Sequence, residues 1–335
     1  MDNVTHTLTG LAISQTGLNR QTRFATLTLI LAANAPDIDV LWGFRGGISY
    51  LQHHRGISHS LLGVVILALI IAAAVYEVGK RMPSKPGAPI RFGWLLLAAG
   101  LGTGSHLLLD FTNGYGVRPF LPFSGRWYAW DIMPIIDPML LGILIVGLGL
   151  PWLLRLVSEE VGARKPRWSL GAVLCLAVIL ALWMVRDFAH RRAVTILDSR
   201  TYAGENPRRV GAFPVPINPF AWSGVAETED AFHVLHVDAL QPNNAPEVLE
   251  AFTKPPMSPA LAAAMRTRGA GVFLDFARFP WAEVNKNEGG FQVSLSDLRF
   301  FDGASRRRGF TLDIELSRSL QTESEQFRFA PPRRD

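Results

Sequence analysis

Four uncharged apolar stretches limit what this chain can fold into. Each is long enough, or nearly so, to cross the roughly 30 Å hydrocarbon core of a bilayer as a helix rising about 1.5 Å per residue. They are Gly56 to Tyr76, Phe92 to Leu109, Pro138 to Leu154 and Trp168 to Val185. A soluble protein would need an unusually large core to bury all four. The sequence therefore predicts a polytopic α-helical membrane bundle with about four transmembrane helices.

A shorter apolar segment lies nearer the start of the chain. Phe24 to Pro36 has 13 residues, too few to cross a bilayer alone. The segment before it, Val4 to Thr16, also has a helical pattern. We interpret the pair as a short N-terminal re-entrant or interfacial hairpin.

Composition agrees with a membrane protein. Hydrophobic residues make up 49% of the 335 residues, charged residues only 18%, and the mean hydropathy is +0.20. The net charge of +5 would suit a nucleic-acid partner, but the basic residues lie in loops between apolar runs. We therefore expect the lipid bilayer as a partner and no nucleic acid, and the oligomeric state stays open.

The sequence changes character after residue 188. No apolar run beyond it suits a membrane, and Pro214, Pro216 and Pro219 interrupt the longest uncharged one. Residues 291–295 and 310–316 alternate in hydropathy as half-buried strands do. We predict two domains: a helical membrane domain at residues 1–188, which would hold any metal site, and a mainly β extramembrane domain at residues 189–335.

Histidines and aspartates gather beside the apolar segments. The single cysteine, Cys175, lies within one of them, so a metal ion would have to be held by imidazole and carboxylate groups. In "SHLLLD", His106 and Asp110 stand four apart and project from one face of a helix. A carboxylate at membrane depth costs about 2.5 to 3.5 kcal/mol unless it is paired or hydrated, and metal coordination would offset that cost. The alternative is an Asp that caps the turn after the helix.

The motif "PDID" adds two carboxylates directly after a proline that is expected to end a helix. In the turn that follows, Asp37 and Asp39 can reach neighbouring positions around one or two divalent ions. Pro-Asp is also common where a helix simply ends, so this motif alone does not distinguish a metal site from an ordinary turn.

The motif "HHRGISH" lies at the start of the first long apolar stretch. Gly56 permits a sharp bend, so His53 or His54 can approach His59. Arg55 can present its planar guanidinium to a phosphate or a carboxylate nearby. The alternative is a solvated loop whose basic side chains face lipid headgroups. Because all three motifs stand at segment ends, which a bundle can bring into one plane, they predict a metal centre at a membrane face.

The ordered set "THTLTG", "APDIDV", "HHRGISHS" and "HLLLD" resembles the YdjM-like family of bacterial inner-membrane metal-dependent hydrolases. The resemblance covers roughly residues 1 to 150. That family is distantly similar to the zinc-dependent phospholipases C, all-helical enzymes that hold zinc with His and Asp side chains. The resemblance implies these metal ligands: His6, Asp37, His53 or His54, His59, His106 and Asp110. It also implies Asp39 as a further ligand or as the general base.

Together these patterns predict a membrane-bound hydrolase that uses a divalent metal, most simply zinc, to activate water. A phosphoester or a lipid-linked substrate fits best, because the site would open where headgroups lie. We expect Asp39 and Arg55 to be the catalytic residues, with Arg55 stabilising the charge that develops. The alternative is a non-catalytic transporter or sensor of divalent ions or protons, in which acidic groups mark an ion pathway.

Loop charges predict the orientation in a bacterial inner membrane. The loop after the first long apolar stretch carries Lys80, Arg81, Lys85 and Arg91. The loop after the third carries Arg155, Arg164, Lys165 and Arg167, against Glu159 and Glu160. Both should be cytoplasmic, so that four crossings place the C-terminal domain on the periplasmic face. A basic collar past the fourth crossing argues the other way: Arg186, Arg191 and Arg192.

Overall fold

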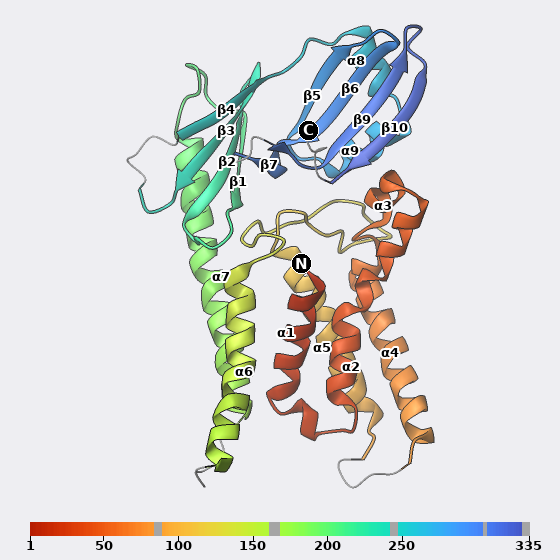
Figure 1. Ribbon diagram of the computed structural model, residues 1–335, viewed down its shortest axis with the longest axis vertical. Coiled ribbons are helices and arrows are strands. Elements are labelled where there is room, and N and C mark those ends of the chain that lie inside the picture. The colour runs from red at the N-terminus through yellow and green to blue at the C-terminus, as the bar shows by residue number, and fades with distance from the viewer. Residues whose placement is uncertain (84–88, 161–167, 242–246, 304–306, 330–335) are drawn as a thin grey trace. The chain divides into compact units, whose positions relative to one another are not determined.

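The computed structural model describes residues 1–83, 89–160, 168–241, 247–303 and 307–329 (Figure 1). The chain forms two compact units. Unit 1 comprises Met1–Asp39 and Arg55–Asp187, and unit 2 comprises Val40–His54 and Phe188–Asp335. The sequence analysis placed residues 1–188, including Val40–His54, in the membrane domain, and this division into a membrane domain and an extramembrane domain stays a prediction. The structure groups Val40–His54 with the C-terminal unit.

Unit 1 is built from helices that run alongside one another (Figure 1). They are α1 (Asn3–Gln15), α2 (Ala25–Asn34), α4 (Leu61–Arg81), α5 (Phe92–Phe111), α6 (Pro138–Glu160) and α7 (Trp168–Asp198), and α7 continues into unit 2. Side-chain caps begin α1 and α4, where Asp2 accepts from Thr5 N at 3.0 Å and Ser60 accepts from Gly63 N at 2.9 Å. Small residues allow close packing, since Gly102 of α5 lies against the Leu29 carbonyl of α2.

The predicted fold class is confirmed, with four candidate membrane helices followed by a domain of antiparallel sheets. By length and composition the candidate spans are Ala25–Arg45, Leu61–Arg81, Phe92–Phe111 and Ser169–Asp198, and Pro138–Leu154 is a shorter apolar helix. The first span differs from the sequence prediction, which ended a helix at Pro36. A 3-10 helix, η2 (Ala35–Arg45), continues α2 instead. Pro36 stands in the first turn of η2, where a missing N–H breaks no hydrogen bond.

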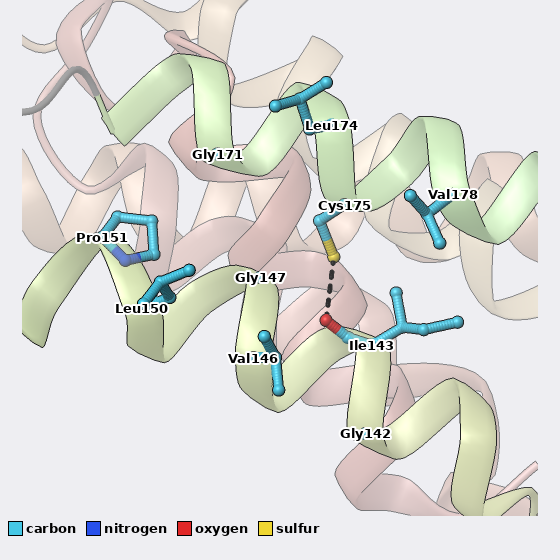
Figure 2. A pocket seen from close by; sticks show the side chains of 10 residues that line it. All are labelled: Gly142, Ile143, Val146, Gly147, Leu150, Pro151, Gly171, Leu174, Cys175 and Val178. Atoms are coloured by element: carbon cyan, nitrogen blue, oxygen red, sulfur yellow. Dashed lines mark hydrogen bonds between the residues drawn. The ribbon is translucent and has the colours of Figure 1, made fainter.

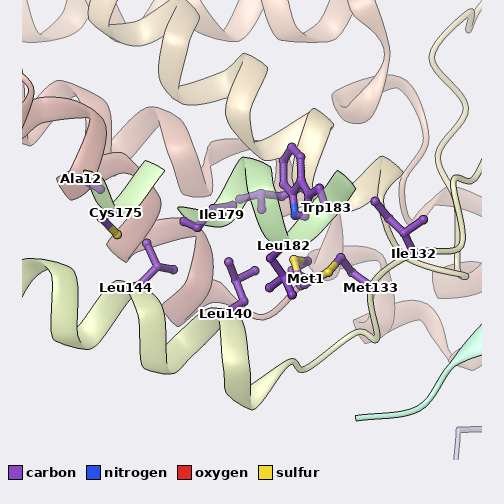
Figure 3. Packing of buried hydrophobic residues seen from close by; sticks show 11 residues of the cluster. Met1, Ala12, Ile132, Met133, Leu140, Leu144, Cys175, Ile179, Leu182 and Trp183 are labelled. Atoms are coloured by element: carbon purple, nitrogen blue, oxygen red, sulfur yellow. The ribbon is translucent and has the colours of Figure 1, made fainter. Parts of the chain in front are cut away.

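Helices α6 and α7 form a pair with an apolar interior. Figure 3 shows Leu140 and Leu144 of α6 packed with Ile179, Leu182 and Trp183 of α7. A separate apolar groove of about 440 Å³ lies between the same two helices (Figure 2). The residues that line it include three glycines and a proline: Gly142, Gly147, Gly171 and Pro151.

A buried ion pair joins α7 to the start of α6. Arg186 and Asp137 are both fully buried, and Arg186 Nη2 donates to Asp137 Oδ2 at 2.8 Å. The other carboxylate oxygen, Oδ1, accepts from Leu140 N at 2.7 Å and so caps α6. The pair therefore fixes the angle at which the two helices meet.

Unit 2 consists of antiparallel sheets and short helices. One sheet has the order β1-β2-β3-β4 and another the order β10-β9-β6-β5. Their strands are β1 (Arg209–Pro214), β2 (Ala221–Glu227), β3 (Ala231–Asp238), β4 (Glu247–Thr253), β5 (Pro280–Lys286), β6 (Gly290–Asp297), β9 (Thr311–Ser317) and β10 (Thr322–Arg328). A small ribbon pairs β7 (Phe301–Asp302) with β8 (Arg307–Arg308). The last turns of α7 pack on the first sheet, where Leu197 meets the fully buried Trp222.

Three more helices of unit 2 lie beside the second sheet. They are α8 (Pro259–Ala264), α9 (Arg268–Phe276) and, from the early part of the chain, α3 (Gly47–His53). Helix α3 packs on α9 and β10. The early segment that leaves unit 1 is thus anchored by residues from the far end of the sequence.

Replacing one partner of the α6–α7 ion pair should destabilise the protein. Arg186→Met leaves a buried carboxylate without its counter-charge, a change that costs about 3–5 kcal/mol in buried pairs. The double variant Arg186→Met/Asp137→Asn should lose less, because it removes both charges and keeps an N-cap. Thermal unfolding in detergent measures the difference. Arg191→Met, at an exposed position of the same helix, is the control, and equal losses in the control and Arg186→Met would contradict the assignment.

Candidate metal centre

Four buried or half-buried side chains of unit 1 converge on one point. They are Asp37, His59, His106 and Asp110, and one ligand atom of each lies within 4.8 Å of the other three. Asp37 comes from η2, His59 from the 3-10 turn η3 (Ile57–His59), and the other two from the end of α5. The Asp37 side chain is 15% exposed, while the other three are essentially inaccessible. Any exchange with the surroundings therefore takes place on the Asp37 side.

Hydrogen bonds fix the tautomer of His106. Its Nδ1 lies 2.7 Å from the carbonyl oxygen of Ala33, which can only accept. Nδ1 therefore carries a proton, and Nε2 presents its lone pair in the neutral ring. A backbone carbonyl in this place is a common support for a metal-ligating histidine.

His59 is oriented in the same way by a carboxylate. Its Nδ1 lies 3.1 Å from Asp39 Oδ2, so Nδ1 donates and Nε2 faces the centre. The Nε2 atoms of His59 and His106 are 3.0 Å apart, so a positive charge, either a proton or a metal ion, has to lie between them. Burial alone would lower the pKa of His59, but the nearby carboxylates of Asp110, Asp37 and Asp39 outweigh it and raise that pKa to about 10. A metal ion would replace that proton.

Four of the separations between ligand atoms are close to those around a tetrahedral ion. Asp37 Oδ1 lies 3.5 Å from Nε2 of both histidines, and Asp110 Oδ2 lies 3.3 Å and 3.5 Å from the same two atoms. Ligands about 2.0–2.1 Å from a tetrahedral zinc ion are separated by about 3.3–3.4 Å. Asp37 Oδ2 and Asp110 Oδ2 are buried and accept no hydrogen bond from the described residues. The donor set and its unused lone pairs therefore suit a divalent metal.

The second oxygen of Asp110 is bound by fixed cations. Arg55 Nη2 donates to Asp110 Oδ1 at 2.9 Å, and the amino group of Met1 contacts the same atom. Arg55 Nη1 donates to Asn113 Oδ1 at 2.9 Å, and the guanidinium stacks on Tyr115 at 4.7 Å. Arg55 is only 3% exposed. The carboxylate is thus held at Oδ1 while Oδ2 faces the histidines.

His6 borders this group without belonging to it. Its ring stacks on His106 with centroids 3.8 Å apart, and its Nε2 lies 3.5 Å from Asp110 Oδ1. Neither ring nitrogen forms a hydrogen bond within the described structure, and the side chain is fully buried. Burial lowers the pKa of His6 to about 4, so the ring is neutral. Its predicted role as a ligand stays a prediction.

The structure places His53 and His54 in unit 2, outside the four-residue group. The His53 ring stacks on Trp42 with centroids 3.9 Å apart, and its Nδ1 lies 2.9 Å from the Ser49 carbonyl oxygen. The His54 ring stacks on Tyr50, with centroids 4.5 Å apart. Both rings thus stack on aromatic side chains of the same unit, and the i, i+4 spacing of Tyr50 and His54 was the sequence signal for the second contact. The predicted roles of His53 and His54 as ligands stay predictions.

Asp39 supports the centre from outside the four ligands. Its Oδ2 accepts from the backbone N of Arg55 at 2.8 Å and from Ser58 Oγ at 3.0 Å, besides its contact with His59. Neither Ser58 nor the carbonyl of Ala33 was singled out from the sequence. A carboxylate with this many donors can orient its neighbours, and the predicted role of Asp39 as general base or ligand stays a prediction.

Comparison with known proteins agrees with the motifs. Residues 1–192 match the model of the YdjM inner membrane protein family. Over 150 residues the chain is 31% identical to the uncharacterized protein YfhP of Bacillus subtilis (strain 168), a match that covers 42% of this chain and 43% of that relative. The match thus spans less than half of the relative's length, and no solved structure matches. Because the family match covers more than half of its residues, the chain belongs to the YdjM inner membrane protein family.

Proposed function

We propose that the protein is a membrane-bound metal-dependent hydrolase. The observation that carries this proposal is the pre-set geometry of the centre, in which two histidines with fixed tautomers and two carboxylates turn unused lone pairs toward one point. Two His and two Asp ligands suit zinc. Zinc supplies a Lewis acid and lowers the pKa of bound water, which is the chemistry of metal-assisted hydrolysis.

The residues around the ion would have different roles in the reaction. Asp37 is the one partly exposed ligand, and its unpartnered Oδ2 is placed to accept a proton from an attacking water. Asp39 holds His59 through Nδ1 and is a positioning residue in this scheme. Arg55 stabilises Asp110, so it would act on the substrate only through that carboxylate.

A lipid or a lipid-linked phosphoester is the substrate class that we propose. Asp37 lies within the first candidate span, and His106 and Asp110 lie in the last turns of the third. Ligands at the end of a membrane helix lie at the depth of headgroups and ester bonds. A site for a freely soluble substrate would have no reason to be built from these segments.

Metal content tests the centre directly. His59→Ala and Asp110→Ala should each lower the zinc bound per protein several-fold, because each removes a ligand and Asp110→Ala also leaves Arg55 without its counter-charge. His53→Ala and His54→Ala serve as matched controls, since both rings stack within unit 2 and should leave the stoichiometry unchanged. Elemental mass spectrometry of purified protein gives the result. Equal zinc content in all four variants would refute the proposed ligand set.

Activity requires a substrate screen. Zinc-loaded protein in detergent should hydrolyse at least one phospholipid or lipid-linked phosphoester, followed by mass spectrometry of the products. The His59→Ala variant should lose this turnover by more than 100-fold, and His53→Ala should retain it. Full metal loading with no turnover of any phosphoester, lipid or amide would favour ion transport or sensing instead.

We also propose that the metal centre and unit 2 lie on the periplasmic side. At the opposite end of unit 1, Arg23 Nη1 donates to the Pro83 carbonyl at 2.9 Å, which joins the α1–α2 turn to the α4–α5 loop. Arg20, Arg23, Lys80, Arg81 and Arg91 therefore gather at one end of unit 1, the end at which α6 finishes and α7 begins (Figure 1). Lys85, Arg164, Lys165 and Arg167 fall outside the described residues. Arg186, which argued for the other orientation, is neutralised inside the helix pair.

Reporter fusions test this orientation. Alkaline phosphatase fused after residue 335 should be active, because it folds only in the periplasm, and a cytoplasmic fluorescent protein at the same site should be dark. A fusion in the loop near Met82 should give the reverse pattern and is the matched control. The opposite pair of results would invert the proposed topology.

A further inference from the structure

The segment Val40–His54 leaves the metal-binding unit and returns to it. It groups with unit 2, whereas the residues that flank it, Asp39 and Arg55, belong to unit 1. Asp39 holds His59, and Arg55 holds Asp110. The two flanking residues are themselves joined, because Arg55 N donates to Asp39 Oδ2 at 2.8 Å. Both ends of the segment therefore reach the second layer of the metal centre.

Helix α3, in the middle of this segment, is seated on the last strand of unit 2. Gly47 lies so close to Phe327 that a Cβ there would stand 3.1 Å from the Phe327 carbonyl oxygen. The Tyr50 ring meets Phe329 edge-on, with centroids 5.1 Å apart. These contacts tie an early part of the chain to β10 and the residue after it.

The chain between α3 and Arg55 is short. His54 ends α3 with its N–H bonded to the Tyr50 carbonyl at 2.7 Å, and the next residue, Arg55, takes a left-handed conformation with φ 53°. Such a conformation is uncommon for a residue with a side chain and persists where its surroundings fix it. Here the backbone N–H and the guanidinium are both bonded, to Asp39 and to Asp110. Arg55, the residue that forms both bonds, thus directly follows the C-cap of α3 in the chain.

We propose that α3 is an arm through which the C-terminal unit sets the geometry and the metal affinity of the centre, an inference that rests on the proposed metal site. With α3 seated on β10, Asp39 and Arg55 stand where one orients His59 and the other holds Asp110. Release of α3 loosens both supports at once. Second-layer partners of this kind typically change metal affinity by 10- to 100-fold. The C-terminal unit is thereby a regulatory element, and any ligand that alters the seating of α3 alters metal binding.

Variants at the α3 seat, far from the ligands, test the proposal. Gly47→Val should weaken zinc binding at least 10-fold and change the visible absorption of the cobalt-substituted protein, because the added side chain pushes α3 off Phe327. Tyr50→Ala should act in the same direction, and Tyr50→Phe should bind as the natural protein does, since it keeps the ring. Gly43→Ala is the control, because its Cβ would stand 3.6 Å from Tyr50 Cδ2, an ordinary van der Waals contact that leaves Tyr50 in place.

Coupling between two sites is reciprocal, which supplies an independent measurement. Zinc added to the full-length protein should slow hydrogen exchange at the backbone amides of α3 and β10. Amides of β2 and β3, in the other sheet, should exchange at an unchanged rate. If zinc affinity and cobalt spectra stay the same in Gly47→Val and Tyr50→Ala, the proposed role of α3 in setting metal affinity is wrong. Failure of the unaltered protein to bind zinc or cobalt would instead refute the metal centre itself.

Discussion

The structure depends on the burial of one carboxylate, Asp110, at the end of a membrane helix. An isolated carboxylate in such a place would be protonated or driven out, since charge is expensive in a low-dielectric medium. Here Oδ1 is bound by Arg55 and Oδ2 faces two imidazoles. Arg55 is buried as well, so removing either charge would leave the other one buried without its counter-charge, which is strongly destabilising. The chain must therefore bring the start of α4 and the end of α5 together before either residue is stable.

Part of this arrangement is readable from sequence, because local spacing determines it. His106 and Asp110 share a helix face at i, i+4, and the apolar runs predicted the first residues of α5, α6 and α7. The alternating residues of the C-terminal region likewise predicted half-buried strands, and the structure has strands β6 and β9 there. In each case the prediction rests on a regular spacing of residues along the chain, and the structure has the helix or strand that this spacing predicts.

The rest could not be read, because it depends on contacts between distant residues. His53 and His54 are near His59 in sequence, but α3 takes them into unit 2, and the partners responsible are Phe327 and Phe329. No local pattern connects those residues. The support of His106 is a backbone carbonyl, which carries no residue identity and leaves no trace in the sequence. Ion-pair partners such as Asp137 and Arg186 are also indistinguishable from loop charges until their helices are packed.

The contact between α3 and β10 can form only after both segments have been synthesised. Gly47 is synthesised early, yet its contact with Phe327 cannot form until β10 at the far end of the chain has been made. Contacts between residues so distant in sequence form late, since the intervening chain has to close a long loop. The helices of unit 1 can pack beforehand, but under the proposed role of α3 the positions of Asp39 and Arg55 depend on a strand that is synthesised much later. A chain truncated before β10 would then contain Asp37, His59, His106 and Asp110 without the strand on which α3 packs.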